Sequence, residues 1–247
     1  MSRIKQLASR VIERLQNKQR VHFLHIGKTG GTAVRHALRE HPSTRRFIIL
    51  LHPHEVKLRD VPVGEGVIFF VRDPITRFVS AFYSRQRQGQ PRYFSPWVPA
   101  EKEAFEHFAT PNQLAVALGS SDDAERARAE KAMRNISVVK DSYWTWFESA
   151  EYFESRLADI FFVGFQERLT DDFEAVKEQL GLPADMKLPA DDVQAHRNPA
   201  HLDRKLDDRA VSNLNEWYKD DFKFIRLCES LIEHRRSADS TTRRRAG

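Results

Sequence analysis

Cysteine is nearly absent from this sequence of 247 residues, in which Cys228 is the only example. No disulfide can therefore form within the chain, and a single thiolate cannot build a metal cluster. Long apolar runs are also missing from residues 2–20, which excludes a signal-peptide core and a membrane span in that stretch. From these absences we expect a cytoplasmic protein.

Excess positive charge is small, and most of it lies at one end of the chain. The formal net charge is +5, and residues 235–247 contribute +4 of it through five arginines against one aspartate. The nearly neutral body lacks the broad basic surface that nucleic-acid binding requires, so we expect no nucleic-acid partner. The polar, basic residues 236–247 are typical of a disordered tail.

The first residues of the chain have an amphipathic pattern. Within residues 1–19, apolar side chains recur at helical spacing and basic side chains lie between them. The pattern predicts an N-terminal helix. That helix either packs on its own domain, as such stripes usually do, or lies on an anionic membrane surface.

Internal repeats and long low-complexity segments are absent as well, which favours one domain over residues 1–247. Short apolar runs at residues 21–26, 47–51, 67–71 and 160–163 have the length of strands buried on both faces, and helical patterns separate most of them. This alternation predicts an α/β fold with a central parallel sheet flanked by helices. Ligands of such folds bind beyond the carboxyl ends of the strands.

A glycine-rich loop follows the first apolar run. Residues 27–32 have the sequence GKTGGT and lead into a predicted helix, so backbone N–H groups and the positive end of the helix dipole converge there. The glycines let an anion approach the backbone, the lysine adds a charge, and the threonines offer hydroxyl donors. The predicted anion ligands are Lys28, Thr29, Gly30, Gly31 and Thr32.

A triphosphate-binding loop is the alternative interpretation. Its pattern, G-x-x-x-x-G-K-[ST], would need glycine at position 22, where this sequence has His22. A magnesium-binding carboxylate is also hard to find, because Asp73 is better explained as the N-cap of a helix that begins with Pro74. The short loop suits a phosphosulfate better than a magnesium-bound triphosphate, so we expect no metal. A kinase-like phosphotransferase stays open.

Two segments taken together resemble the sulfotransferases that use 3′-phosphoadenosine 5′-phosphosulfate (PAPS). They are HIGKTGGT at residues 25–32 and FVRDPITRFVS at residues 70–80. The resemblance implies a three-layer, P-loop-like fold and transfer of a sulfuryl group from PAPS to a hydroxyl group. In that family the first segment holds the 5′-phosphosulfate, and an arginine and a serine of the second hold the 3′-phosphate. Those roles correspond to Arg72 and Ser80 here.

A hydroxyl acceptor must lose a proton during the transfer, and histidine is the usual base. His52 and His54 come directly after the second apolar run, at the edge where ligands are expected. The LHPH sequence at residues 51–54 resembles the heparan sulfate 2-O-sulfotransferase branch, in which a histidine at this place is the base. The resemblance implies His54 first and His52 second. Negative charge grows on the leaving oxygen during the transfer, and we expect Lys28 to stabilise it.

Arg197 is a further candidate for binding the nucleotide. Its segment resembles the family region that closes over the donor, although a plain loop arginine is an equal alternative.

The acceptor is the least determined part of the site. Residues 92–154 are rich in aromatic side chains, and we expect their helices to cover the ligand end of the sheet on the acceptor side. The 2-O-sulfotransferase resemblance favours a carbohydrate or glycolipid, while a tyrosine or a small metabolite stays open. A non-catalytic protein that binds anionic ligands or membranes through its basic ends is the third interpretation.

Overall fold

A computed structural model describes residues 18–191, 198–199 and 201–246 of the chain. Residues 1–17, which include most of the predicted N-terminal helix, and the candidate ligand Arg197 lie outside the described residues.

In the described part of the chain, four parallel strands form one sheet in the order β2-β1-β3-β4. Three of the strands contain a complete predicted apolar run and β1 contains the beginning of the fourth, which confirms the predicted parallel sheet. The first strand differs from the prediction because it ends at Phe23, so Leu24 and Ile26 are buried without being part of it. The strands are β1 (Gln19–Phe23), β2 (Phe47–Leu51), β3 (Gly66–Val71) and β4 (Ile160–Phe165).

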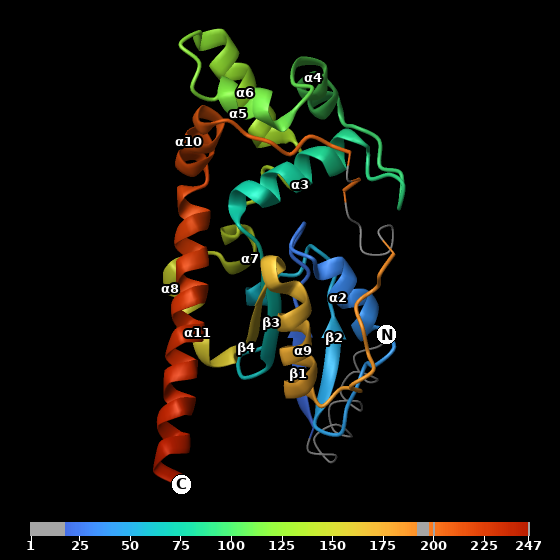
Figure 1. The fold of residues 1–247 in the computed structure, drawn as a ribbon, viewed down its shortest axis with the longest axis vertical. Helices are drawn as coiled ribbons and strands as arrows, with labels where there is room; N and C mark the ends of the chain where they lie inside the picture. Colours follow the sequence, from blue (N-terminus) through green and yellow to red (C-terminus); the bar gives the residue numbers. More distant parts are fainter. Residues whose placement is uncertain (1–17, 192–197, 200, 247) are drawn as a thin grey trace.

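Helices cover both faces of this sheet, and the alternation of side chains along β3 explains why (Figure 1). Phe69 points to a core shared with α7, α8 and α11, whereas Phe70 points to a second core shared with α2 and α9. Both phenylalanines are fully buried, so the strand needs apolar residues at every position. These helices are α2 (Gly31–Leu38), α7 (Trp144–Phe147), α8 (Ala150–Ser155), α9 (Leu169–Leu180) and α11 (Lys219–Ala246).

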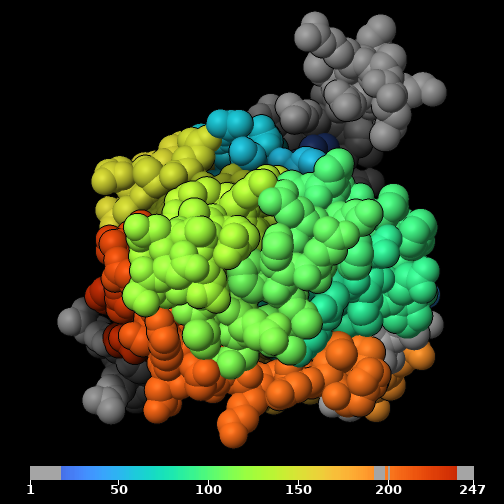
Figure 2. Space-filling model, turned by 90° about the horizontal axis from the view of Figure 1, so that it is seen from above, coloured from blue at the N-terminus to red at the C-terminus, as the bar shows by residue number. Residues whose placement is uncertain are grey.

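A third core joins the remaining helices beyond the carboxyl ends of the strands. Helix α3 begins where the sequence predicts, because the Asp73 carboxylate accepts from the Thr76 N–H at 2.8 Å and Pro74 occupies the first turn. Viewed from this end, α4 to α6 cover the molecule and the chain around α10 lies along one side (Figure 2). The helices are α3 (Pro74–Gln86), α4 (Pro99–His107), α5 (Pro111–Ala117), α6 (Asp123–Asn135) and α10 (Asp208–Trp217).

The aromatic-rich residues 92–154 therefore divide between two places. Helices α4 to α6 lie over the ligand end, as expected, but the aromatic side chains of α7 and α8 pack on a face of the sheet. Trp146, Phe147 and Phe153 are buried there, and this burial explains why that part of the segment is so aromatic.

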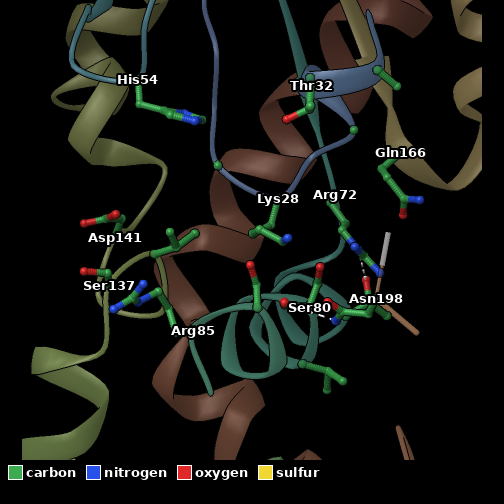
Figure 3. A pocket seen from close by; sticks show the side chains of 18 of the residues that line it. Lys28, Thr32, His54, Arg72, Ser80, Arg85, Ser137, Asp141, Gln166 and Asn198 are labelled. Carbon is green, nitrogen blue, oxygen red and sulfur yellow. Dashed lines mark hydrogen bonds between the residues drawn. The ribbon is translucent and has the colours of Figure 1, made fainter. Parts of the chain in front are cut away.

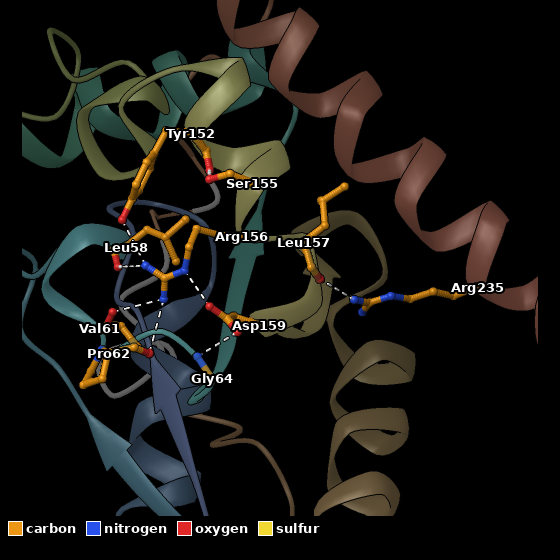
Figure 4. Close-up of polar contacts among 10 residues, drawn as sticks. All are labelled: Leu58, Val61, Pro62, Gly64, Tyr152, Ser155, Arg156, Leu157, Asp159 and Arg235. Atoms are coloured by element: carbon orange, nitrogen blue, oxygen red, sulfur yellow. Dashed lines mark hydrogen bonds and ion pairs between the residues drawn. The ribbon is translucent and has the colours of Figure 1, made fainter.

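At the opposite end of the sheet, short 3-10 turns are joined by one buried arginine (Figure 4). Arg156 pairs with Asp159 at 2.5 Å and donates to the carbonyl oxygens of Leu58, Val61 and Pro62. One guanidinium thus satisfies several buried acceptors, as its fork of five donors allows. The turns are η1 (Leu58–Asp60) and η2 (Leu157–Asp159), with η3 (Gln166–Arg168) after β4.

The basic end of the chain differs from the predicted disordered tail. Helix α11 continues through Ala246, so residues 236–246 are helical in the structure. No helix in the described ranges combines the length and apolar character needed to cross a bilayer.

Candidate functional site

A cavity of about 1040 Å³ lies beyond the carboxyl ends of the strands. The loops that follow β1, β2, β3 and β4 all contribute to its wall, as does the polar side of α3. This is the position at which open parallel sheets bind ligands. Further wall residues come from the segment between α6 and α7 and from the chain that precedes α10.

Lys28 lies in the middle of this wall, on the loop between β1 and α2 (Figure 3). Its Nζ is buried and has no hydrogen-bond partner among the described residues. Burial lowers its pKa to about 7, and three nearby guanidinium groups add to the effect, those of Arg72, Arg87 and Arg92. A buried ammonium without a partner is costly, so the position is suited to an anionic ligand that would compensate it.

The glycines of the loop allow neighbouring side chains to pack closely against it. Gly30, the N-cap of α2, has a φ of 81°, a left-handed conformation that favours glycine. A Cβ on Gly30 would lie 2.9 Å from Leu169, and one on Gly31 would lie 2.7 Å from the His25 ring. Both glycines line the cavity, so the N-terminus of α2, with its free backbone N–H groups, is open to a ligand.

The two threonines of the loop have different roles. Thr32 lines the cavity, with its Oγ1 3.4 Å from His25 Nε2. Thr29 is buried, does not line the cavity, and donates its hydroxyl proton to the carbonyl oxygen of Ile26. The prediction that the Thr29 hydroxyl binds the anion is therefore corrected, because that donor stabilises the turn itself.

Arg72 and Ser80 line the same cavity as Lys28, on the side that Figure 3 shows away from His54. Arg72 comes from the end of β3, where its Nε donates to Thr76 Oγ1 at 2.9 Å. Ser80 lies on the side of α3 that faces the cavity, and its side chain is largely buried. The cavity thus joins the two predicted anion-binding points, one at Lys28 and the other at Arg72 and Ser80.

The backbone of Arg72 is held by a residue that the sequence did not reveal. The buried hydroxyl of Tyr143 accepts from the Arg72 N–H at 2.9 Å and donates to the Arg72 carbonyl oxygen at 2.6 Å. Tyr143 is distant in sequence and sits in an aromatic-rich stretch, so no local pattern separated it from packing residues.

Asn198 is the second residue that the structure adds. Its side chain donates to the Ser80 carbonyl oxygen at 3.2 Å and accepts from Arg87 at 3.0 Å, and it lines the cavity beside Ser80. Asn198, which follows the candidate Arg197 in the sequence, thus lies at the cavity.

His54 reaches the cavity from the turn that follows β2. Its Nδ1 donates to the His25 carbonyl oxygen at 2.6 Å, and its ring stacks on the His25 ring with 3.8 Å between centroids. With the proton fixed on Nδ1, Nε2 carries the lone pair. Partial burial lowers the pKa of His54, so the ring is a neutral base near pH 7.

His52 does not line this cavity. Its Nε2 lies 2.8 Å from Nδ1 of His22, whose other nitrogen lies 2.6 Å from a Glu65 carboxylate oxygen. The chain turns at His54 and does not continue as a strand, so the two histidines lie in different surroundings. Of the two predicted candidates for the base, His54 is the one that lies at the cavity.

A buried arginine ties the loop to the opposite wall. Arg77 donates to the Gly27 carbonyl oxygen at 3.0 Å and to the Asp141 carbonyl oxygen at 2.7 Å. Its guanidinium also lies over the rings of Tyr143 and Trp146. Arg77 thus links two walls of the cavity.

Carboxylates are few around the cavity. In the described ranges, no group of three or more His, Cys, Asp or Glu side chains is arranged to hold a metal ion. Asp73, the one candidate magnesium ligand of the alternative interpretation, caps α3, which confirms its predicted local role.

Comparison with known proteins gives one match. The model of the sulfotransferase family matches residues 13–225, which is most of the chain and includes every cavity loop described above. A search of curated proteins found no match.

Proposed function

Because this chain belongs to the sulfotransferase family, we propose that it transfers a sulfuryl group from PAPS to a hydroxyl group of a carbohydrate. The proposal covers the donor, the acceptor class and the roles of individual residues. We further propose that the reaction takes place in the cytoplasm.

The buried ammonium of Lys28 carries this proposal. It lacks a partner among the described residues, and the cavity that it faces also contains Arg72 and Ser80. PAPS is an adenylate with anionic groups at both the 5′ and 3′ positions, so it can use two such points at once. Two separate anion-binding points also discriminate against nucleotides without a 3′-phosphate. The residues present therefore fit the proposed donor.

On the donor side, Lys28 and the N–H groups at the start of α2 would hold the 5′-phosphosulfate. Arg72 and Ser80 would hold the 3′-phosphate, with Asn198 fixing the backbone of Ser80. PAPS supplies an activated sulfuryl group whose bond to the 5′-phosphate oxygen breaks during transfer.

On the acceptor side, Nε2 of His54 would take the proton from the attacking hydroxyl group. The acceptor oxygen forms the new bond to sulfur as the old sulfur–oxygen bond breaks, and adenosine 3′,5′-bisphosphate leaves. Lys28 would stabilise the negative charge that develops on the leaving oxygen, and the removal of one such interaction typically costs about a hundredfold or more in rate.

The size of the cavity supports a ternary complex. About 1040 Å³ is slightly above the range of single-ligand sites, roughly 300–1,000 Å³, which leaves room for an acceptor beside the nucleotide. The carbohydrate assignment rests on the sequence around His54.

The first test is thermal unfolding without magnesium. Adenosine 3′,5′-bisphosphate should stabilise the protein by about 2.7 kcal/mol at a hundred times its Kd, and adenosine 5′-phosphate at equal concentration should stabilise it much less. Stabilisation by ATP with magnesium and none by the bisphosphate would overturn the proposal in favour of a phosphotransferase. The second test is transfer of labelled sulfate from PAPS to a panel of glycans, glycolipids and phenols.

A further inference from the structure

Apart from Arg85, the charged side chains of the cavity wall are separated by sign. The charges that act on Lys28 are all cationic, those of Arg72, Arg87 and Arg92. The charges that act on His54 include both anionic side chains of the wall, Glu55 and Asp141, together with Arg35, which is not part of the wall. Figure 3 shows the same division, with Asp141 on the side of His54 and Arg72 on the other side of Lys28.

Arg85 also lies on the His54 side of the cavity, but its charge is already compensated. Its Nε and Nη2 pair with the two carboxylate oxygens of buried Glu101 at 2.8 and 2.5 Å. Glu101 in turn accepts from the backbone N–H groups of Ser137 and Val98. A guanidinium so fully paired offers little attraction to an anionic acceptor.

Asp141 differs from Glu101 in this respect. Its carboxylate has no hydrogen bond or ion pair with any described residue, so it acts as a net negative charge on the wall. Its backbone, however, is fixed, because Arg77 donates to the Asp141 carbonyl oxygen at 2.7 Å. Val138, three residues earlier and also on the wall, has a φ of 68°, which is rare for a β-branched residue. Strain of this kind is kept where the fold determines the position of a functional segment.

From this arrangement we propose that Asp141, assisted by Glu55, selects an acceptor that is uncharged or carries an amino group near its reacting hydroxyl. The inference rests on the proposed function and adds the charge of the substrate. A carboxylate or sulfate group on the sugar that enters beside His54 would face Asp141 at short range. Two like charges a few ångströms apart lower the affinity by about tenfold or more at an intermediate dielectric. Uronate-rich and already sulfated glycans are therefore poor acceptors.

The experiment compares three acceptors that share one scaffold and differ in charge. They are the 4-nitrophenyl β-glycosides of glucose, glucosamine and glucuronic acid, each offered with PAPS, and the readout is kcat/KM for sulfate transfer. The glucoside and the glucosaminide should exceed the glucuronide by about tenfold or more. In the Asp141→Asn variant this ratio should fall by about fivefold to tenfold, with the glucuronide gaining.

Asp171→Asn is the matched control, because Asp171 is exposed on α9 and does not line the cavity. It should leave the ratio unchanged. Glu55→Gln is the second variant if Asp141→Asn does not fold, and it should move the ratio in the same direction.

The inference is overturned if the glucuronide is the best of the three acceptors or if both variants leave the ratio unchanged. Turnover of none of the three, with stabilisation by adenosine 3′,5′-bisphosphate retained, also counts against it. Loss of that stabilisation would instead overturn the proposed function itself.

Discussion

The hydroxyl of Tyr143 makes two hydrogen bonds to the backbone of Arg72, one to its N–H at 2.9 Å and one to its carbonyl oxygen at 2.6 Å. Arg72 is the last residue before the N-cap of α3, so these bonds fix the point at which the chain leaves β3 for the cavity wall. One fully buried side chain, which never touches the cavity, thus sets the direction of a proposed phosphate ligand.

Tyr143→Phe is expected to weaken binding of adenosine 3′,5′-bisphosphate by severalfold. The change leaves the N–H and the carbonyl oxygen of Arg72 without these hydrogen bonds, and an unsatisfied group costs about 1–3 kcal/mol where it is buried. Tyr218→Phe is the matched control, because Tyr218 is also buried and donates to the Val139 carbonyl oxygen at 3.0 Å. Isothermal titration should show weaker binding for the first variant alone. Equal weakening in both would contradict a specific role for Tyr143.

Lys28→Met is expected to make the protein inactive but more stable in the absence of ligand. The pKa of Lys28 falls from 10.5 to about 7 on folding, so between these values the unfolded chain binds more protons and stability rises with pH. Below pH 7 the buried, protonated lysine lowers the free energy of unfolding by its full amount, about 5 kcal/mol at most for a pKa shift of this size. Methionine removes that cost, and the gain over the natural protein should disappear towards pH 10.

Urea unfolding of the two proteins at pH 6 and pH 10 measures this difference. A destabilised Lys28→Met variant at pH 6 would mean that the ammonium has a partner in solution and that the site is not held ready for an anion.

The pH dependence of transfer should follow His54 and Lys28 together. His54 must be neutral to accept a proton, and its pKa lies below 6.5. The value of kcat/KM for PAPS therefore falls as the pH drops through the pKa of His54. Lys28 must be protonated to bind the donor, so the same quantity falls as the pH rises above about 7. The profile should be bell-shaped. His54→Ala should abolish transfer and recover part of it with added imidazole, while His52→Asn, at the separate His22 contact, should retain transfer.

The sequence predicted the sheet, the loop and the start of α3 because each has a local cause. Apolar runs mark strands buried on both faces, and Asp73 with Pro74 marks a helix start whatever the rest of the chain does. The end of β1 was misplaced by the same reasoning, since Leu24 and Ile26 are as buried as strand residues but lie beyond the strand. Burial alone does not distinguish a strand from a buried loop.

The rest of the site depends on contacts between distant segments, which no local pattern contains. His52 and His54 alternate in the sequence, yet the turn at His54 separates them, and the partner of His52 lies thirty residues away. Tyr143 and Asn198 act through backbone groups of Arg72 and Ser80, so nothing in their own neighbourhoods indicates a role. Such residues become visible only when the fold brings them together.

Gly30→Ala is expected to disable the donor loop, and Gly64→Ala is its matched control. Both glycines have left-handed backbones, with φ of 81° and 86°, so each substitution should cost about 1–2 kcal/mol in backbone strain. A Cβ on Gly30 would also lie 2.9 Å from Leu169, whereas nothing lies within 4 Å of one on Gly64. Both variants should unfold at lower urea, but only Gly30→Ala should lose binding of the bisphosphate. Retained binding in Gly30→Ala would contradict the need for close packing in the loop.

Arg77→Met is expected to loosen the cavity on both sides at once. The guanidinium joins Gly27, at the start of the donor loop, to Asp141, on the acceptor side, so its loss leaves two carbonyl oxygens unpaired. At about 1–3 kcal/mol for each buried unsatisfied group, the variant should be less stable by several kcal/mol. Amide exchange of residues 27–32 should become faster, and the bisphosphate should bind more weakly.

Loss of stability by itself could also weaken binding, and Arg156→Met separates the two effects. Arg156 is equally buried and also donates to backbone carbonyl oxygens, but it lies at the far end of the sheet (Figure 4). Its loss should lower the urea midpoint at least as much, because it also leaves the buried Asp159 carboxylate unpaired, while amide exchange of residues 27–32 and bisphosphate binding at low temperature stay unchanged. If Arg156→Met weakened binding as much as Arg77→Met, the effect of Arg77 would be one of general stability, and the link between Gly27 and Asp141 would have no separate part in holding the nucleotide.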